Sequence, residues 1–212
     1  EATGWLLRLR TDARGRFDAL GIPKPSDEDW RQTNVQAVAP FAATVAGPAS
    51  ASASALDALP LASALPCRAV LVNGRVDETL SNLSGLPRGM RVRSLATELA
   101  ESPDRLEPHL GRGASGENAP FVALNTALFA DGIVVTVDAD VDASVSLHVV
   151  YVAVPGAAPA AIHPRTLVIA VTQSGATADT NRAVDLAVER GAVTLAIVNR
   201  RSSDITWKTA GV

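Results

Sequence analysis

The stretch Val171-Thr-Gln-Ser-Gly-Ala-Thr-Ala-Asp-Thr180 marks a change in the sequence pattern of this chain. It follows the apolar run Leu167–Val171 and precedes a helix-like segment up to Arg190, a stop residue, Gly191, and a second apolar run, Val193–Val198. Continuous apolar runs of this length are typical of strands buried on both faces. The order strand, helix, strand predicts a βαβ unit with parallel strands and a right-handed crossover.

The loop of this unit, Thr172–Thr177, has the composition of a phosphate-binding loop. Hydroxyls and free backbone N–H groups at a helix N-terminus face the ligand, and the helix dipole favours negative charge there. The alternative is that Ser174 or Thr177 only caps the helix while Asp179 complements its dipole. Spacing alone favours the capping interpretation.

The strands predicted before residue 171 are shorter than those of this unit. Ala69–Val72 is an apolar strand that leads into an Asn73-Gly74 turn. Apolar residues alternate in Ile133–Val137 and again in Val145–Tyr151. Short strands separated by Asp-rich turns predict stacked β coils or a sandwich rather than a doubly wound sheet.

Helical patterns lie mainly at the N-terminus. Residues 5–20 predict an amphipathic helix with a basic outer face that ends at Gly21. Its apolar face comprises Leu6, Leu9, Ala13, Phe17 and Leu20. Ser26 is placed to cap a second helix with an acidic first turn. Phe121–Phe129 predicts a further helix, and the Ala/Ser-rich residues 47–66 predict a flexible linker or a marginal helix.

Composition narrows the classes of function. The chain has 212 residues, 47% apolar and 19% charged, with a net charge of −3. This charge gives no reason to expect nucleic acid or an anionic membrane as a partner. The one cysteine, Cys67, excludes an internal disulfide and a cysteine-only metal site, and its apolar surroundings predict a buried thiol in a reducing compartment.

Neither a membrane span nor a signal peptide is predicted. Ala143–Ile162 lacks Asp, Glu, Lys and Arg, but its prolines, its glycine and its partial alternation indicate a strand and a turn. The first residue is Glu1, and no basic-then-apolar leader follows it. We expect a trimmed or partial chain.

The first part resembles the N-terminal region of SufD, the partner of SufB and SufC in iron–sulfur cluster assembly. The resemblance begins with Asp27-Glu-Asp-Trp-Arg-Gln-Thr-Asn34, preceded by Gly21 and Pro23. It continues in order through Val72-Asn-Gly-Arg75, Leu86-Pro-Arg-Gly-Met-Arg-Val92, Phe121-Val-Ala-Leu-Asn-Thr-Ala127, Asp131-Gly132 and His163-Pro-Arg165. It covers about residues 3–169.

This resemblance implies a helical N-terminal region followed by the first coils of a parallel β-helix, and SufB- and SufC-type partners. The family's cluster-assembly histidine and cysteine region and its SufC-holding helices have no counterpart in this sequence. His109, His148 and His163 are predicted to be surface or turn residues. We expect no cofactor and no metal site.

The second part, about residues 168–212, resembles a sugar isomerase (SIS) domain, as in glucosamine-fructose-6-phosphate aminotransferase. The resemblance rests on Thr172-Gln-Ser-Gly-Ala-Thr-Ala-Asp-Thr180, Leu195-Ala-Ile-Val-Asn199 and Ser202-Ser203. It implies that a sugar phosphate is the ligand of the loop, held by Thr172, Gln173, Ser174 and Thr177. The family's catalytic acid–base residues and ring-opening histidine have no counterpart, so no catalytic residue is assigned.

The sequence thus predicts an α+β chain: a helical N-terminal region, first coils of a parallel β-helix or a short-stranded β layer, and a C-terminal βαβ unit. The predicted divisions are residues 1–118, 119–169 and 170–212. The first hypothesis for function is a truncated, cytoplasmic, non-enzymatic SufD-like component of an assembly complex. The alternatives are a sugar-phosphate-binding SIS fragment, or a chimeric chain, an artefact of gene assembly, with no function as a unit.

Overall fold

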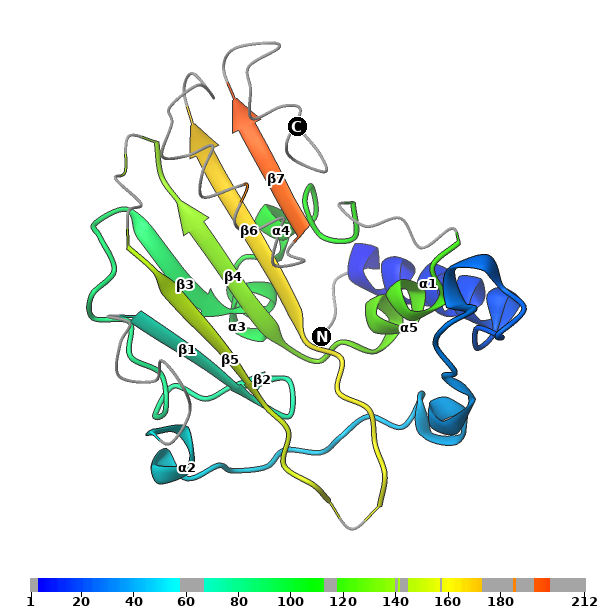
Figure 1. Cartoon of the computed structure of the whole chain (residues 1–212). Coiled ribbons are helices and arrows are strands. Elements are labelled where there is room, and N and C mark those ends of the chain that lie inside the picture. The colour runs from blue at the N-terminus through cyan, green and yellow to red at the C-terminus, as the bar shows by residue number, and fades with distance from the viewer. Residues whose placement is uncertain are drawn as a thin grey trace.

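The computed structural model describes residues 4–57, 67–112, 118–139, 141, 145–156, 158–172, 185 and 193–198. Its helices are α1 Gly4–Leu20, η1 Glu28–Trp30, η2 Gln36–Phe41, α2 Ala53–Asp57, α3 Leu95–Glu101, α4 Pro103–Leu106 and α5 Pro120–Leu128. Its strands are β1 Cys67–Val72, β2 Arg75–Val76, β3 Met90–Ser94, β4 Gly132–Val137, β5 Leu147–Val152, β6 Arg165–Thr172 and β7 Val193–Val198. Helices and small mixed sheets make this an α+β fold, as predicted (Figure 1).

The first helix, α1, forms where the spacing of apolar residues predicts it. Leu6 and Ala13 are buried on its inner face. The chain leaves the helix at Gly21, whose φ is +70° and whose N–H donates to the carbonyl of Phe17 at 2.7 Å. The last residue of the predicted apolar face, Leu20, is 41% exposed, so this face is buried only along its N-terminal part.

The prediction of a second helix capped by Ser26 is wrong in the type of helix and in the capping residue. The segment Glu28–Trp30 is a single 3-10 turn, and its N-cap is Asp27 rather than Ser26. The Asp27 carboxylate accepts from the N–H of Lys24 at 2.9 Å and makes no capping bond to the turn. Because the side chain closes the preceding turn instead, the first free N–H groups of a longer helix would have no acceptor.

One sheet has the strand order β2-β1-β5. The β1–β2 pair is antiparallel, and the two residues between the strands, Asn73 and Gly74, have φ values of +47° and +78°. Positive φ at both positions is the signature of the tight hairpin turn that Asn-Gly predicts. On its other side β1 pairs in parallel with β5, with Cys67 opposite Leu147.

The other sheet has the order β3-β4-β6-β7. Its β3 is antiparallel to β4, whereas β4, β6 and β7 are parallel. The parallel strands predicted for the C-terminal βαβ unit are therefore confirmed. Strand β6 continues without a break from Arg165 to Thr172, through the position where the sequence pattern changes.

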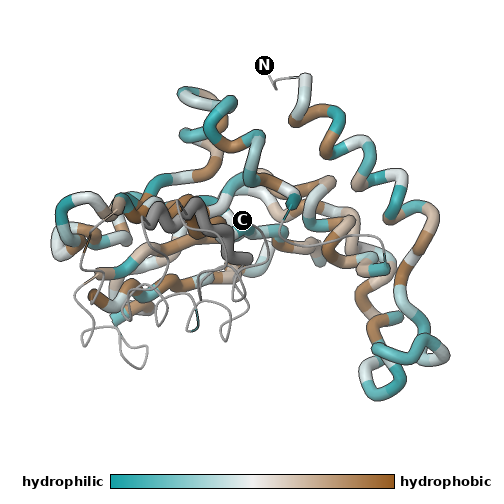
Figure 2. Tube along the Cα trace, turned by 90° about the horizontal axis from the view of Figure 1, so that it is seen from above, coloured by the Kyte–Doolittle hydropathy of each residue, from teal (hydrophilic) through white to brown (hydrophobic). Residues whose placement is uncertain are grey.

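Among the residues that the structure describes, three apolar clusters hold the layers together. Between the sheets, Ala69 and Leu71 of β1 face Ile133 and Val135 of β4. The far side of the second sheet packs on α1, α3 and α4 through a cluster of Leu6, Leu95, Leu106, Leu110, Phe129, Val134, Leu167 and Ile169. The far side of the first sheet packs on α2 through Leu56, Val70, Val72, Leu80 and Val150. Hydrophobic residues follow the strands, while α1 alternates between hydrophilic and hydrophobic positions (Figure 2).

No helix in the part of the chain that the structure describes is long and apolar enough to cross a membrane. The charge-free segment from residue 143 onward contains strand β5, in agreement with the strand predicted there. Of residues 47–66, those from 53 to 57 form the short helix α2, and residues 58–66 lie outside the described part.

Candidate functional site

The residues predicted to hold a sugar phosphate fall almost entirely outside the described part of the chain. Thr172 is the last residue of β6, at the position expected for the start of the loop. Gln173, Ser174 and Thr177 lie outside the described residues, as does the predicted helix apart from Asp185, which is helical. The hypothesis of a sugar-phosphate site therefore remains a prediction.

Contacts among the motif residues of the first part join α5 to the start of β6. The side chain of Asn125 donates to the carbonyl of Pro164 at 3.0 Å and accepts from Nε of Arg165 at 3.2 Å. A second nitrogen of the same guanidinium donates to the hydroxyl of Thr126. Two motifs about 40 residues apart in sequence thus form one hydrogen-bonded joint.

Two arginines share one aromatic ring at this joint. The guanidinium carbon of Arg10, from α1, lies 4.8 Å from the ring centroid of Phe129, and that of Arg165 lies 5.2 Å from it. Arg10 also donates to the carbonyl of Phe129 at 3.0 Å. We call Arg10, Asn125, Thr126, Phe129 and Arg165 the arginine clasp.

The arginine clasp places positive charge at the C-terminus of α5. This helix has no basic residue in its own last turn, and Phe129 is its C-cap. Cations near a helix C-terminus are stabilised by the partial negative charge there. Burial lowers the pKa of Arg165 to about 10, so this guanidinium remains cationic near neutral pH, and burial also lowers the pKa of Arg10. The clasp is suited to join α1, α5 and β6, and it contains no pair of nucleophile and base.

A second joint is built on Asp131, which is 5% exposed. One carboxylate oxygen accepts from the N–H of Val76 at 2.9 Å. The other accepts from the hydroxyl of Ser94 and the N–H of Ala96, each at 2.9 Å. Because Ser94 is the N-cap of α3, this carboxylate also lies at a helix N-terminus, where negative charge is favoured.

The Asn73-Gly74 turn fixes a third set of contacts. The Asn73 side chain bonds both the N–H and the carbonyl of Val154, at 2.8 and 3.2 Å, and donates to the carbonyl of Gly47 at 3.2 Å. Nearby, Nε2 of His163 lies 3.2 Å from the carbonyl oxygen of Ala42. The N-terminal segment is thereby attached to the loop between β5 and β6.

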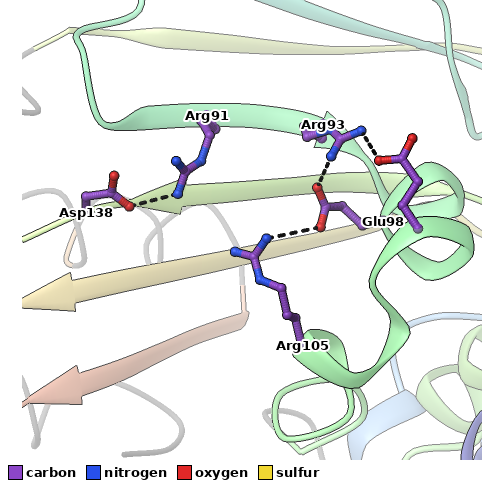
Figure 3. Close-up of polar contacts among 6 residues, drawn as sticks. Arg91, Arg93, Glu98, Arg105 and Asp138 are labelled. Carbon is purple, nitrogen blue, oxygen red and sulfur yellow. Dashed lines mark hydrogen bonds and ion pairs between the residues drawn. The ribbon is translucent and has the colours of Figure 1, made fainter.

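Charged side chains on β3, α3 and α4 form an ion-pair network (Figure 3). Glu98 is 6% exposed and lies 2.8 Å from Arg93 and 3.9 Å from Arg105. Arg93 also bonds Glu101 at 2.7 Å, and this bond, with the charge of Glu98, raises the pKa of Arg93. Arg91 pairs with Asp138 at 2.9 Å. The positive and negative charges of the network balance one another, which suits a structural role.

The histidines and the cysteine are not brought together. Cys67 is fully buried at the start of β1, as predicted. His148 lies within β5 rather than in a turn, and His109, His148 and His163 are all half-buried. Within the described ranges, no group of three or more His, Cys, Asp or Glu residues is placed to hold a metal ion.

Comparison with known proteins agrees with both resemblances. A family model of the SufBD protein N-terminal region matches residues 63–149, and a model of the SIS domain matches residues 147–209. An iron–sulfur cluster assembly SufBD family protein of Synechocystis is 27% identical over 195 residues, which are 92% of this chain and 41% of that protein. A chloroplastic SufBD family protein of Arabidopsis thaliana is 26% identical over 146 residues, covering 62% of this chain and 26% of that protein.

The chain therefore resembles SufBD proteins in its first part and a SIS domain in its second part, as predicted. It spans less than half the length of these two relatives. The Synechocystis match takes in 195 of 212 residues, so it extends past residue 171 into the SIS-like part. The two resemblances overlap, in keeping with the unbroken course of β6.

Sequence reasoning identified the motif residues but not what they contact. Arg10 was missed altogether, because its partner Phe129 is 119 residues away. The sequence marks Asp131 only as part of the Asp131-Gly132 pair among the motifs of the first part. The order of the motifs along the chain carried the family resemblance, and the contacts between motifs required the fold.

Proposed function

We propose that this chain is a SufD-like, non-enzymatic scaffold component of an iron–sulfur cluster assembly complex. The observation that carries the proposal is the SufBD N-terminal match over residues 63–149, with a SufBD relative aligned to most of the chain. Its motif residues contact one another through side chain–backbone bonds, as in the arginine clasp and around Asp131.

The strand order supports a further proposal about the fold, that the sheets are the first coils of a parallel β-helix. Leaving aside the antiparallel partners β2 and β3 and the last strand, β7, successive strands alternate between the two sheets: β1, β4, β5 and β6. Each strand pairs in parallel with the next strand in its own sheet, β1 with β5 and β4 with β6. Two stacked coils would produce this pairing.

The proposed partners are SufB- and SufC-type proteins, by family resemblance, in the cytoplasm. Because the SufC-holding helices of the family have no counterpart in residues 1–212, we expect this chain to bind a SufB-type protein and not to retain SufC by itself. The divisions at residues 118 and 169 stay a prediction.

A pull-down with the tagged 212-residue chain tests this proposal. The bait is offered purified SufB-type and SufC-type proteins separately, at about micromolar concentration. Retention of the SufB-type protein is the expected result. Retention of neither protein would contradict the scaffold role, and stable retention of SufC alone would contradict the assignment of partners.

The second candidate function, a sugar-phosphate-binding SIS fragment, is favoured by the SIS match and the parallel β6–β7 pair. Thr172, Gln173, Ser174 and Thr177 would hold the phosphate. Without further cleft residues we expect weak binding and no isomerase activity. The third alternative, a chimeric chain with no function as a unit, is tested by sequencing the uninterrupted gene through the codons for Ile169 to Gln173.

A further inference from the structure

The Asn73-Gly74 turn carries a reactive pair of residues whose chemistry depends on the contacts around it. Asparagine is a thermolabile residue, and its deamidation is easiest before glycine, which has no Cβ to shield its backbone nitrogen. Of the asparagines in the sequence, Asn73 is the one that glycine follows. The reaction requires the nitrogen of Gly74 to attack the side-chain amide of Asn73.

The structure holds this amide in place. Oδ1 of Asn73 accepts from the N–H of Val154 at 2.8 Å, and Nδ2 donates to the carbonyls of Val154 and Gly47, each at 3.2 Å. Nδ2 is the atom that leaves in deamidation, so the reaction has to break both of the bonds that it donates. The turn itself is closely packed, because a Cβ on the buried Gly74 would lie 2.9 Å from Cγ2 of Ile162.

Asn73 joins the turn to two segments that also bond each other. Gly47 ends an extended stretch, residues 42–47, which we call the strap. The N–H of Ala46 donates to the carbonyl of Ala161 at 2.9 Å, and the N–H of Ala161 donates to the carbonyl of Thr44 at 2.7 Å. Ala161 and Val154 both belong to the connection between β5 and β6. The side chain of Asn73 therefore closes the joint between the strap and this connection.

We propose that Asn73 is a site of spontaneous deamidation, that the folded chain suppresses this reaction, and that the modification releases the strap. In the first step the nitrogen of Gly74 bonds to Cγ of Asn73. Nδ2 leaves as ammonia together with the proton of the Gly74 N–H, and a cyclic imide remains. Water then adds to one of the two imide carbonyls, giving aspartate if the ring opens at Cγ and isoaspartate if it opens at the backbone carbon. The net reaction is a hydrolysis and needs no oxidant or reductant.

The products do not fit the joint. An aspartate at residue 73 can still accept from the N–H of Val154, but its second oxygen faces the carbonyl oxygens of Val154 and Gly47 and has no hydrogen to donate. Facing acceptors repel each other, and residue 73 is half-buried, so water compensates only in part. Isoaspartate also adds a backbone carbon to a tight turn whose φ values fix the hairpin. This modification is independent of the scaffold role and of the Thr172–Thr177 loop.

Incubation of the full chain at mildly alkaline pH, folded in buffer or unfolded in guanidinium chloride, tests the suppression. Peptide mass spectrometry detects at residue 73 the mass difference between an amide and a carboxyl group, and Asn82, which leucine follows, is the internal control. Because the bonds that hold Asn73 have to break first, deamidation should be at least about tenfold slower in the folded chain. Equal rates in the two states, or no reaction in the unfolded chain, would overturn the proposal.

The variant Asn73→Asp reproduces one product and tests the release of the strap. The amide hydrogens of Ala46 and Ala161 bond across the strap and should exchange at least about tenfold faster in this variant. Asn82→Asp is the matched control, since Oδ1 of Asn82 accepts from the N–H and the hydroxyl of Ser84 and a carboxylate keeps both bonds. Unchanged exchange in Asn73→Asp would overturn the release of the strap. If this variant fails to fold, the same exchange measured on wild-type chain that has deamidated after folding decides the question.

Discussion

Gly132 and Arg165 are so close that no side chain fits between them: a Cβ atom on Gly132 would lie 2.0 Å from the carbonyl oxygen of Arg165. The two residues are in register on the parallel strands β4 and β6. The same Arg165 makes the side-chain contacts of the arginine clasp. The close approach at its backbone therefore sets where the clasp lies relative to the sheet.

We expect Gly132→Ala to destabilise the chain by about 3 kcal/mol or more, because the atom in its way is backbone and cannot turn aside. Gly15→Ala is the matched control. Gly15 lies in α1 with nothing within 4 Å of its Cβ position, so this change should stabilise the helix by about 0.5–1 kcal/mol. Urea unfolding measures the free energy of unfolding of both variants. Equal changes in the two variants would show that the close approach at Gly132 is unimportant for stability.

Asp131→Ala should destabilise the chain by about 3–5 kcal/mol, because it leaves three donors without their acceptor. Asp138→Ala is the control, since its pair with Arg91 is about half exposed and should contribute less than about 1 kcal/mol. The free energy of unfolding in urea gives the comparison. A loss below about 1 kcal/mol for Asp131→Ala would contradict the role assigned to this carboxylate.

Stability should fall as the pH is lowered below about 6.5. Burial lowers the pKa of His163, opposed by its hydrogen bond to Ala42, and burial together with the charge of Arg112 lowers that of His109. A histidine whose pKa is lower in the folded state contributes stability above its unfolded pKa and loses it as the pH falls through the folded value. His163→Gln and His109→Gln should each flatten the pH dependence of the unfolding free energy between pH 7.5 and 5. An unchanged slope in both variants would refute this.

The isolated chain should not hold an iron–sulfur cluster. Such clusters usually need four thiolate or imidazole ligands close together, and the one cysteine and three histidines of the sequence are not gathered into a ligand group within the described ranges. Anaerobic reconstitution followed by desalting should leave the visible spectrum without sulfide-to-iron absorbance, in wild type and in Cys67→Ala alike. Absorbance that tracks protein concentration and disappears in Cys67→Ala would count against this.

Fructose 6-phosphate should bind the C-terminal loop no more tightly than about millimolar. Two or three bonds to phosphate contribute roughly 1.5–3 kcal/mol each at best, while ordering the loop and ligand costs several kcal/mol. Amide signals of Gln173–Thr177 report binding in an NMR titration. Ser174→Ala should weaken binding and Thr11→Ala, in α1, should not. Saturation at micromolar ligand, lost in Ser174→Ala, would favour the SIS-type function.

Local chemistry made part of the fold predictable. The Asn73-Gly74 turn, the stop at Gly21 and the parallel pair β6 and β7 each depend on residues close in sequence. The prediction that Ser26 caps a helix is wrong, because the carboxylate of the next residue, Asp27, closes the preceding turn instead. Whether such a local prediction is correct depends on which of several nearby groups makes the hydrogen bond. Residue propensities predict the result only where no other group competes for the same bond.

The remaining features depend on distant partners. Nothing in the sequence around Arg10 indicates that it will lie on Phe129, and nothing around Arg68 indicates that His148 will be its neighbour. Periodicity predicts that a residue is in a strand or helix, but not which other strand or helix it meets. The candidate loop site was predictable only through resemblance, and three of its four residues lie outside the described part.

The parallel pairing of Cys67 with Leu147 has a consequence for synthesis on the ribosome. The two residues are 80 positions apart, so β1 emerges long before its partner β5 exists. Until then, among the described residues, the two-residue β2 and the bridge between Arg68 and Asn82 cover one edge of an apolar strand. We expect nascent chains that end between these strands to be the ones that chaperones hold and that aggregate, since non-local pairing delays burial.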